Sequence, residues 1–165
     1  MQITVIGTGF VGVVTATVYA SLGHQVTGLD VDERKVESLR HNQVPFYEPQ
    51  LEELLKKEQL ACRLSFTTDY AAAISQADLI FLAVGTPSAP DGQADLKYIF
   101  KATESLAPYL KSGAIVVVKS TVPPGTLEKI ETIIKSQTQT EFFTASVPEF
   151  LREGSAVYDT LHPSR

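Results

Sequence analysis

The sequence has 165 residues, of which 44% are hydrophobic and 20% are charged, as is typical of a globular domain. Its net charge of −5 and isoelectric point of about 5.2 argue against a nucleic-acid or anionic-membrane partner. The single cysteine excludes an internal disulfide and favours a cytoplasmic location. The three histidines are scattered and show no metal-ligand spacing with that cysteine, so we expect no metal site.

The chain begins with QITVI at residues 2–6, which is rich in β-branched residues and predicts a strand. Residues 1–29 carry no Lys, Arg, Asp or Glu, which is also true of the apolar part of a signal peptide. However, no basic residue precedes the apolar run, and glycines and threonines dilute it. A strand entering a glycine-rich turn explains the same residues better, so we predict neither a signal peptide nor a membrane span.

The next elements alternate between helical and strand patterns. The turn GTGFVG leads into VVTATVYASLG, whose small and apolar residues suit a helix packed closely on a sheet. HQVTGLD at 24–30 predicts a second strand, and Asp32 is placed to begin a helix through DERKVESLRH. LEELLKKEQL at 51–60 predicts an amphipathic helix.

Two nearly continuous apolar runs, DLIFLAV at 78–84 and AIVVVKS at 114–120, have the pattern of parallel strands covered on both faces. Between them, Asp95 is placed to cap a helix through LKYIFKATESL. After them, PPGTLEKIETIIK has helical spacing with Pro124 near its start, and EFFTASV at 141–147 predicts a last strand. This order, with two extra helical insertions, predicts one α/β domain over residues 1–165 with a Rossmann-like, doubly wound parallel sheet.

Gly7, Gly9 and Gly12 form a GxGxxG pattern between a predicted strand and a predicted helix. The first glycine allows a tight turn, the second lets a pyrophosphate approach the backbone, and the third lets the helix pack closely. Asp30 follows Gly12 by 18 residues, at the end of the second predicted strand, where an acidic residue binds a ribose 2′-hydroxyl. The pattern therefore predicts a dinucleotide site.

The acidic residues also predict which dinucleotide binds. The carboxylate of Asp30 would repel the 2′-phosphate of NADP, and Asp32 would add to that repulsion, so we expect NAD. Lys35 lies one helical turn further on, where it reaches a ribose or phosphate edge or is simply a solvated helix charge, and the solvated charge is the better interpretation from the residues alone.

Two later loops fall at the same carboxyl edge of the sheet, GTPSAPDG at 85–92 and STVPPGT at 120–126. Gly85 supplies backbone freedom, and the hydroxyls of Thr86 and Thr121 are placed either to meet a ligand or to make local turn bonds.

The stretch VPEFLREGSA at 147–156 opens onto the same edge. Pro148 suits the first position of a helix and Gly154 the residue after its end, which predicts a short helical turn with Glu149 and Glu153 on one face. The alternative is a solvated, charge-rich turn.

With these motifs assembled, the chain resembles the N-terminal domain of the nucleotide-sugar 6-dehydrogenases, and within that family the UDP-glucose branch. The stretches that carry the resemblance are ITVIGTGFVG, PFYEPQLEELL, VGTPSAPDGQADL, KSTVPPGT and PEFLREGSAVYDTLHPSR.

The resemblance implies a reaction in which UDP-glucose, two NAD and water give UDP-glucuronate, through an aldehyde held as a thiohemiacetal and a thioester that water hydrolyses. It implies UDP-sugar and NAD as ligands, and a homodimer for the full-length protein, while this chain alone is expected to be a monomer. The same domain of an enzyme acting on GDP-mannose or a UDP-N-acetyl sugar is an alternative, and a free-standing, non-catalytic NAD-binding module is another.

The resemblance also assigns residues. Thr121 and Glu149 would hold and activate water, with Glu149 the base for thioester hydrolysis and Glu153 beside them in the catalytic site. The sugar nucleotide would contact Glu149, Phe150, Leu151, Arg152 and Glu153. The NAD site would comprise Gly7, Gly9, Phe10, Val11, Gly12, Asp30, Lys35, Gly85, Thr86, Thr121 and Glu153.

Other parts of the family pattern are missing. The nucleophilic cysteine, a lysine and an asparagine of the family lie beyond HPSR, so the chain is expected to be truncated and unable to complete the oxidation, with Cys62 in a structural role. Val147 stands where the family usually has Asn, which would cap the predicted helical turn, and Gln50 replaces a usual glycine.

Overall fold

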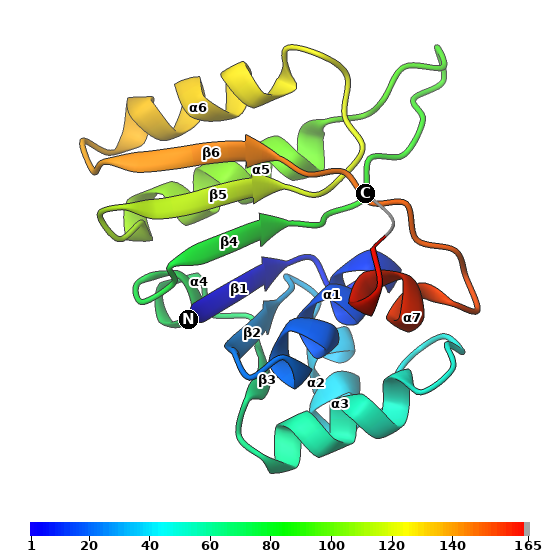
Figure 1. Ribbon diagram of the computed structural model, residues 1–165. Helices are drawn as coiled ribbons and strands as arrows, with labels where there is room; N and C mark the ends of the chain where they lie inside the picture. The colour runs from blue at the N-terminus through cyan, green and yellow to red at the C-terminus, as the bar shows by residue number, and fades with distance from the viewer. Residues whose placement is uncertain (164–165) are drawn as a thin grey trace.

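The computed structural model describes residues 1–163, which form a six-stranded parallel sheet covered by helices on both faces (Figure 1). The strand order is β3-β2-β1-β4-β5-β6, so the chain reverses its direction of winding between β1 and β4. This confirms the predicted doubly wound α/β fold. The strands are β1 (Gln2–Ile6), β2 (Gln25–Leu29), β3 (Leu64–Thr67), β4 (Leu79–Leu82), β5 (Ala114–Val118) and β6 (Phe142–Ser146).

The helices begin and end close to the predicted positions. Asp32 accepts a hydrogen bond from the Arg34 N–H at 3.0 Å and caps α2, and Asp95 accepts one from the Lys97 N–H at 3.0 Å where α5 begins. The helices are α1 (Phe10–Ser21), α2 (Glu33–Arg40), α3 (Leu51–Leu60), α4 (Tyr70–Ile74), α5 (Lys97–Leu106), the 3₁₀ turn η1 (Ala107–Tyr109), α6 (Thr126–Gln137) and α7 (Ala156–Leu161). None of the helices within residues 1–163 is long and apolar enough to cross a membrane.

A separate hydrophobic core lies on each face of the sheet. Val5 and Phe81 point to the face covered by α1, α2, α3 and α7. Ile6 and Leu82, the next residues along the same strands, point to the face covered by α4, α5 and α6. Because both faces are buried, the central strands β4 and β5 are continuous apolar runs. Each fully buried Ile or Leu side chain stabilises the fold by about 1.5–3 kcal/mol.

Four short elements were not predicted: β3, α4, the 3₁₀ turn η1 and α7. β3 has only four residues, and its Ser65 is exposed, so the segment lacks the long apolar run that identified β4 and β5. Asp69 caps α4 by accepting from the Ala72 N–H at 3.1 Å. β3 is the edge strand beside β2, so the number of strands was underestimated by one.

The predicted helical turn between Pro148 and Gly154 is wrong. Residues 147–152 have no helical structure, and the helix that follows, α7, begins at Ala156. Gly154 has a φ of +88°, and it precedes this helix rather than ending one. Val147 therefore does not occupy a helix-capping position, and its departure from the family pattern has no consequence for a cap.

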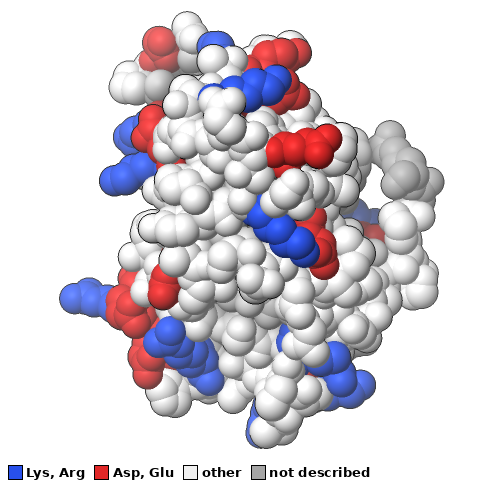
Figure 2. Space-filling model, turned by 90° about the vertical axis from the view of Figure 1, so that its left-hand side faces the viewer, with Lys and Arg blue, Asp and Glu red and all other residues white. Residues whose placement is uncertain are grey.

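The face at the amino ends of the strands carries acidic and basic side chains interspersed (Figure 2). Asp78 and Lys111, which precede β4 and β5, form an ion pair at this edge. Opposite charges are thus paired at the amino edge of the sheet, whereas the predicted ligand site lies at the carboxyl edge.

Candidate functional site

A cleft of about 910 Å³ opens at the carboxyl ends of β1, β2 and β4, where the direction of winding reverses. In open α/β sheets this switch point is the usual place for a ligand. Six of the predicted site residues line it: Gly7, Gly9, Asp30, Lys35, Gly85 and Thr86. The other predicted cofactor residues, Phe10, Val11, Gly12, Thr121 and Glu153, are not among the lining residues.

The three glycines of the turn have different surroundings. A Cβ on Gly7, whose φ is +97°, would lie 2.7 Å from the carbonyl oxygen of Ala83, and a Cβ on Gly12 would lie 1.8 Å from the carbonyl oxygen of Gly7. These two glycines are required by close packing. A Cβ on Gly9 would meet no atom of the described residues within 4 Å, so the backbone here faces open space at the start of α1. This is the arrangement that a phosphate group needs at a helix N-terminus.

Asp30 is held in place by three hydrogen bonds. Its Oδ2 accepts from the Thr8 N–H and the Thr8 hydroxyl, each at 2.8 Å, and its Oδ1 accepts from the Asp32 N–H at 3.0 Å. Burial raises the pKa of Asp30, but these hydrogen bonds and the charge of Lys35 outweigh it, so the pKa lies below its ordinary value. The carboxylate is therefore ionised, and Oδ1 can accept a further hydrogen bond. Sequence reasoning missed Thr8.

The wall of the cleft formed by α4 and α5 was also missed: α4 was not predicted, and no residue of the predicted helix α5 was assigned to the site. Tyr70 of α4 and Tyr98, Lys101 and Ser105 of α5 line this wall. Burial raises the pKa of Tyr70, and a hydrogen bond with the Ser105 side chain partly offsets this rise. The cleft thus pairs a polar, glycine-rich side with a side that carries aromatic rings, as is common in sites for nucleotides.

The two loops after β4 and β5 are bonded to each other. The Thr86 hydroxyl donates to the carbonyl oxygen of Thr121 at 3.0 Å, and the Ser120 hydroxyl donates to the carbonyl oxygen of Val84 at 2.6 Å. The Thr86 hydroxyl thus bonds to a second loop, 35 residues away, and not within its own turn, and Thr86 also lines the cleft. Thr121 is exposed, and its backbone is fixed by this bond.

The segment from 147 to 155 runs along the carboxyl edge of the sheet from β6 to α7, which packs beside α1 (Figure 1). The carboxylate of Glu149 accepts a hydrogen bond from the Leu151 N–H, and Leu151 packs against the core. Arg152 donates to both carboxylate oxygens of Asp159, at 3.1 and 2.6 Å, and holds the pKa of Asp159 at about 2. Phe150 and Glu153 are exposed.

Lys119, at the end of β5, is a half-buried cation that the sequence did not identify. Burial lowers its pKa, and the nearby Glu149 carboxylate partly offsets this effect. The charge of Glu149 thus acts on Lys119 at the same edge of the sheet, although the two side chains form no ion pair within residues 1–163.

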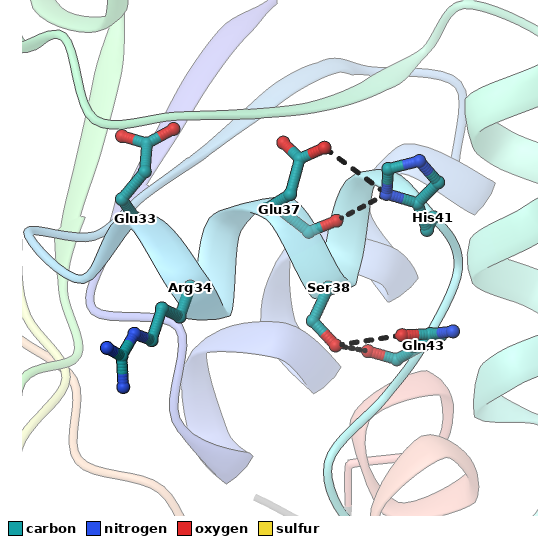
Figure 3. A pocket seen from close by; sticks show the side chains of 6 residues that line it. All are labelled: Glu33, Arg34, Glu37, Ser38, His41 and Gln43. Atoms are coloured by element: carbon teal, nitrogen blue, oxygen red, sulfur yellow. Dashed lines mark hydrogen bonds and ion pairs between the residues drawn. The ribbon is translucent and has the colours of Figure 1, made fainter.

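A second hollow, of about 490 Å³, lies on the outer surface of α2 and contains none of the predicted site residues (Figure 3). Two pairs of its residues bond to each other, His41 with Glu37 and Ser38 with Gln43, and Glu33 bonds outside it to Arg40 and Thr68. Within residues 1–163, no group of three or more His, Cys, Asp or Glu is placed to hold a metal ion. Cys62 is exposed in the turn after α3, outside the cleft.

Comparison with known proteins gives consistent matches over the whole chain. The chain matches the NAD binding domain of the UDP-glucose/GDP-mannose dehydrogenase family over residues 1–165. It is 47% identical to UDP-glucose 6-dehydrogenase YwqF of Bacillus subtilis, over the full chain but only 38% of that protein. It is 46% identical to the UDP-glucose 6-dehydrogenase of Rickettsia conorii, again over 38% of the relative. The chain thus spans well under half the length of these relatives.

Solved structures agree. A UDP-glucose dehydrogenase from Pyrobaculum islandicum superposes with a TM-score of 0.94 at 45% identity, over 99% of this chain and 39% of the other. A GDP-mannose dehydrogenase from Pseudomonas aeruginosa gives the same TM-score at 36% identity, over 99% of this chain and 39% of the other. The glycine turn, the fixed Asp30 and these matches lead to one conclusion: the chain belongs to the UDP-glucose/GDP-mannose dehydrogenase family, as its NAD binding domain.

Proposed function

We propose that this chain binds NAD in the cleft at the switch point, with Asp30 accepting a hydrogen bond from the ribose next to the adenine. The observation that carries the proposal is the fixed carboxylate of Asp30, which is ionised and keeps acceptor capacity on Oδ1. Its negative charge disfavours a 2′-phosphate at the same place, which selects NAD over NADP.

The residues present fit the rest of the cofactor. The open backbone at Gly9 leaves room for the pyrophosphate beside the N-terminus of α1, while Gly7 and Gly12 shape the turn. When bound, NAD supplies the hydride acceptor. We assign the remaining contacts to Phe10, Val11, Lys35, Gly85, Thr86, Thr121 and Glu153.

A calorimetric titration with NADH and with NADPH tests the proposal. We expect NADH to bind and NADPH to bind much more weakly. We expect Asp30→Ala to weaken NADH about 10- to 100-fold, because a hydrogen bond to a charged group is lost. Asp78→Ala is the matched control, since it removes one carboxylate at the opposite edge of the sheet and should leave the affinity unchanged. Equal affinity of the wild type and Asp30→Ala for NADH would overturn the assignment.

We further propose that the protein to which this domain belongs oxidises UDP-glucose to UDP-glucuronate. Identities of 43–47% to UDP-glucose 6-dehydrogenases, against 36% to a GDP-mannose dehydrogenase, support this substrate. In this proposal Glu149 and Thr121 hold and activate water, and the segment from Glu149 to Glu153 lines the sugar-nucleotide site. In this proposal Cys62, which is exposed and outside the cleft, is not the nucleophile, and the nucleophilic cysteine comes from outside these 165 residues.

Turnover of UDP-glucose and of GDP-mannose by a protein that joins this domain to the remaining part of the enzyme separates the two substrate classes. Faster turnover of GDP-mannose would replace UDP-glucose in the proposal.

We also propose that this domain alone is monomeric, that the full-length protein is a homodimer, and that both work in the cytoplasm. Light scattering of the isolated chain tests the first of these points.

A further inference from the structure

The loop between α2 and α3 contains a buried acid that the cofactor site does not use. Glu48 has 4% of its surface exposed. Its Oε2 accepts a hydrogen bond from the Gly154 N–H and its Oε1 from the Ala156 N–H, both at 2.7 Å. These donors lie 106 and 108 residues further along the chain, at the point where the 147–155 segment turns into α7.

No cation compensates for the burial of this carboxylate: none of the ion pairs formed within residues 1–163 includes Glu48. A buried carboxylate is costly unless hydrogen bonds satisfy it, and bonds from N–H groups to a charged oxygen are among the stronger ones in proteins. Moving the segment away would leave Glu48 buried without its two donors. The contact therefore fixes the position of residues 154–156.

The same loop also touches the dinucleotide side of the molecule. The ring of Phe46 packs on the ring of Phe10, with centroids 5.0 Å apart, and Phe10 is the first residue of α1 after the glycine turn. The loop thus contacts two different regions. Phe46 contacts the glycine turn, and Glu48 contacts the end of the 147–155 segment and the start of α7.

We propose that Glu48 is a positioning residue, which holds the segment carrying Glu149 and Glu153 in a fixed place relative to the NAD cleft. That these two glutamates act on ligands rests on the proposed function. The bonds that Glu48 makes are independent of it, so the two can be tested separately.

Amide hydrogen exchange, followed by NMR on the chain without ligand, tests the positioning contact. In the wild type, the amides of Gly154 and Ala156 should be protected. In Glu48→Gln one acceptor oxygen becomes a donor, so exchange at these amides should be about tenfold faster or more, while the amides of β1 keep their protection. Glu52→Gln, an exposed change of the same charge on α3, should leave all of them unchanged.

The wild type alone can overturn the proposal, if the amides of Gly154 and Ala156 exchange as fast as those of exposed loops. Unchanged exchange in a folded Glu48→Gln variant would overturn it as well. If Glu48→Gln does not fold, Glu48→Asp, which shortens the side chain by one methylene, replaces it with the same expectation.

Addition of NADH separates positioning from a merely structural role. In the wild type, NADH should shift the resonances of both Gly9 and Gly154. In Glu48→Gln, the shift at Gly9 should persist, the shift at Gly154 should disappear, and NADH should bind about three- to tenfold more weakly. An unchanged shift at Gly154 contradicts the positioning role. If Gly9 does not shift even in the wild type, the proposed NAD site fails, while the exchange data still decide whether Glu48 holds the segment.

Discussion

Two regions meet at the carboxyl edge of this sheet, and they are built differently. The turn from Gly7 to Gly12, together with Asp30, is held mainly by contacts between β1, α1 and β2, which are neighbours in sequence and in space, and Gly7 also packs against Ala83 after β4. The segment from 147 to 155 has no helix or strand of its own. Its position depends on a carboxylate more than a hundred residues away, that of Glu48.

The difference shows where local chemistry determines structure and where it does not. Each glycine of the turn has a steric reason that can be stated from its spacing alone. The acidic segment has Pro148 and Gly154 at spacings that fit a short helix, yet the structure uses Gly154 with positive φ before α7. There the tertiary contacts override the local pattern.

The largest effect should come from a pair of substitutions in the turn. Gly12→Ala places a methyl group 1.8 Å from a carbonyl oxygen, so we expect a loss of more than about 3 kcal/mol in the free energy of unfolding. Gly9→Ala meets open space at a φ of −76°, so stability should change by less than about 1 kcal/mol. Its methyl group would occupy the place proposed for the pyrophosphate, however, so NADH should bind about tenfold more weakly or worse.

Urea unfolding and NADH titration measure both quantities on the same proteins. A folded Gly12→Ala variant of wild-type stability would contradict the close packing of α1 on the turn. A Gly9→Ala variant with wild-type affinity would show that the dinucleotide does not pass over this residue.

A smaller effect should follow from Thr8→Val, which keeps the shape of a buried side chain and removes one of the bonds to Asp30. The pKa of Asp30 in the folded protein, now below its unfolded value of 3.8, should rise towards it. The stabilisation that Asp30 contributes is present above the unfolded pKa and is lost as the pH falls through the folded pKa. Thr8→Val should therefore cost about 1 kcal/mol at neutral pH, and less as the pH falls below about 4.

Urea unfolding at pH 7 and pH 3 checks this prediction, with Thr8→Ser as the control that keeps the hydroxyl. An equal loss of stability at both pH values would mean that Thr8 acts through packing and not through the charge of Asp30.

Much of the fold and part of the site could be predicted from the sequence. The long apolar runs identified β4 and β5, and Asp32 marked the start of α2, because these signals depend on neighbouring residues. The wall containing Tyr70 was missed together with the short α4. No spacing could have paired Glu48 with Gly154, because that contact exists only once α1, α3 and α7 have packed together.

The smallest effect concerns Val147, at the position where the resemblance described above leads us to expect Asn. Had a helix begun here, Val147→Asn would supply a cap and stabilise the protein by about 1 kcal/mol. In the structure Val147 continues from β6, its N–H donates to the carbonyl oxygen of Val118 at 2.9 Å, and the residue is 48% exposed. We therefore expect the substitution to change the free energy of unfolding by less than about 0.5 kcal/mol, measured by urea denaturation. A gain of a full cap's magnitude would mean that the segment is helical in solution, and that its dependence on Glu48 is weaker than the structure indicates.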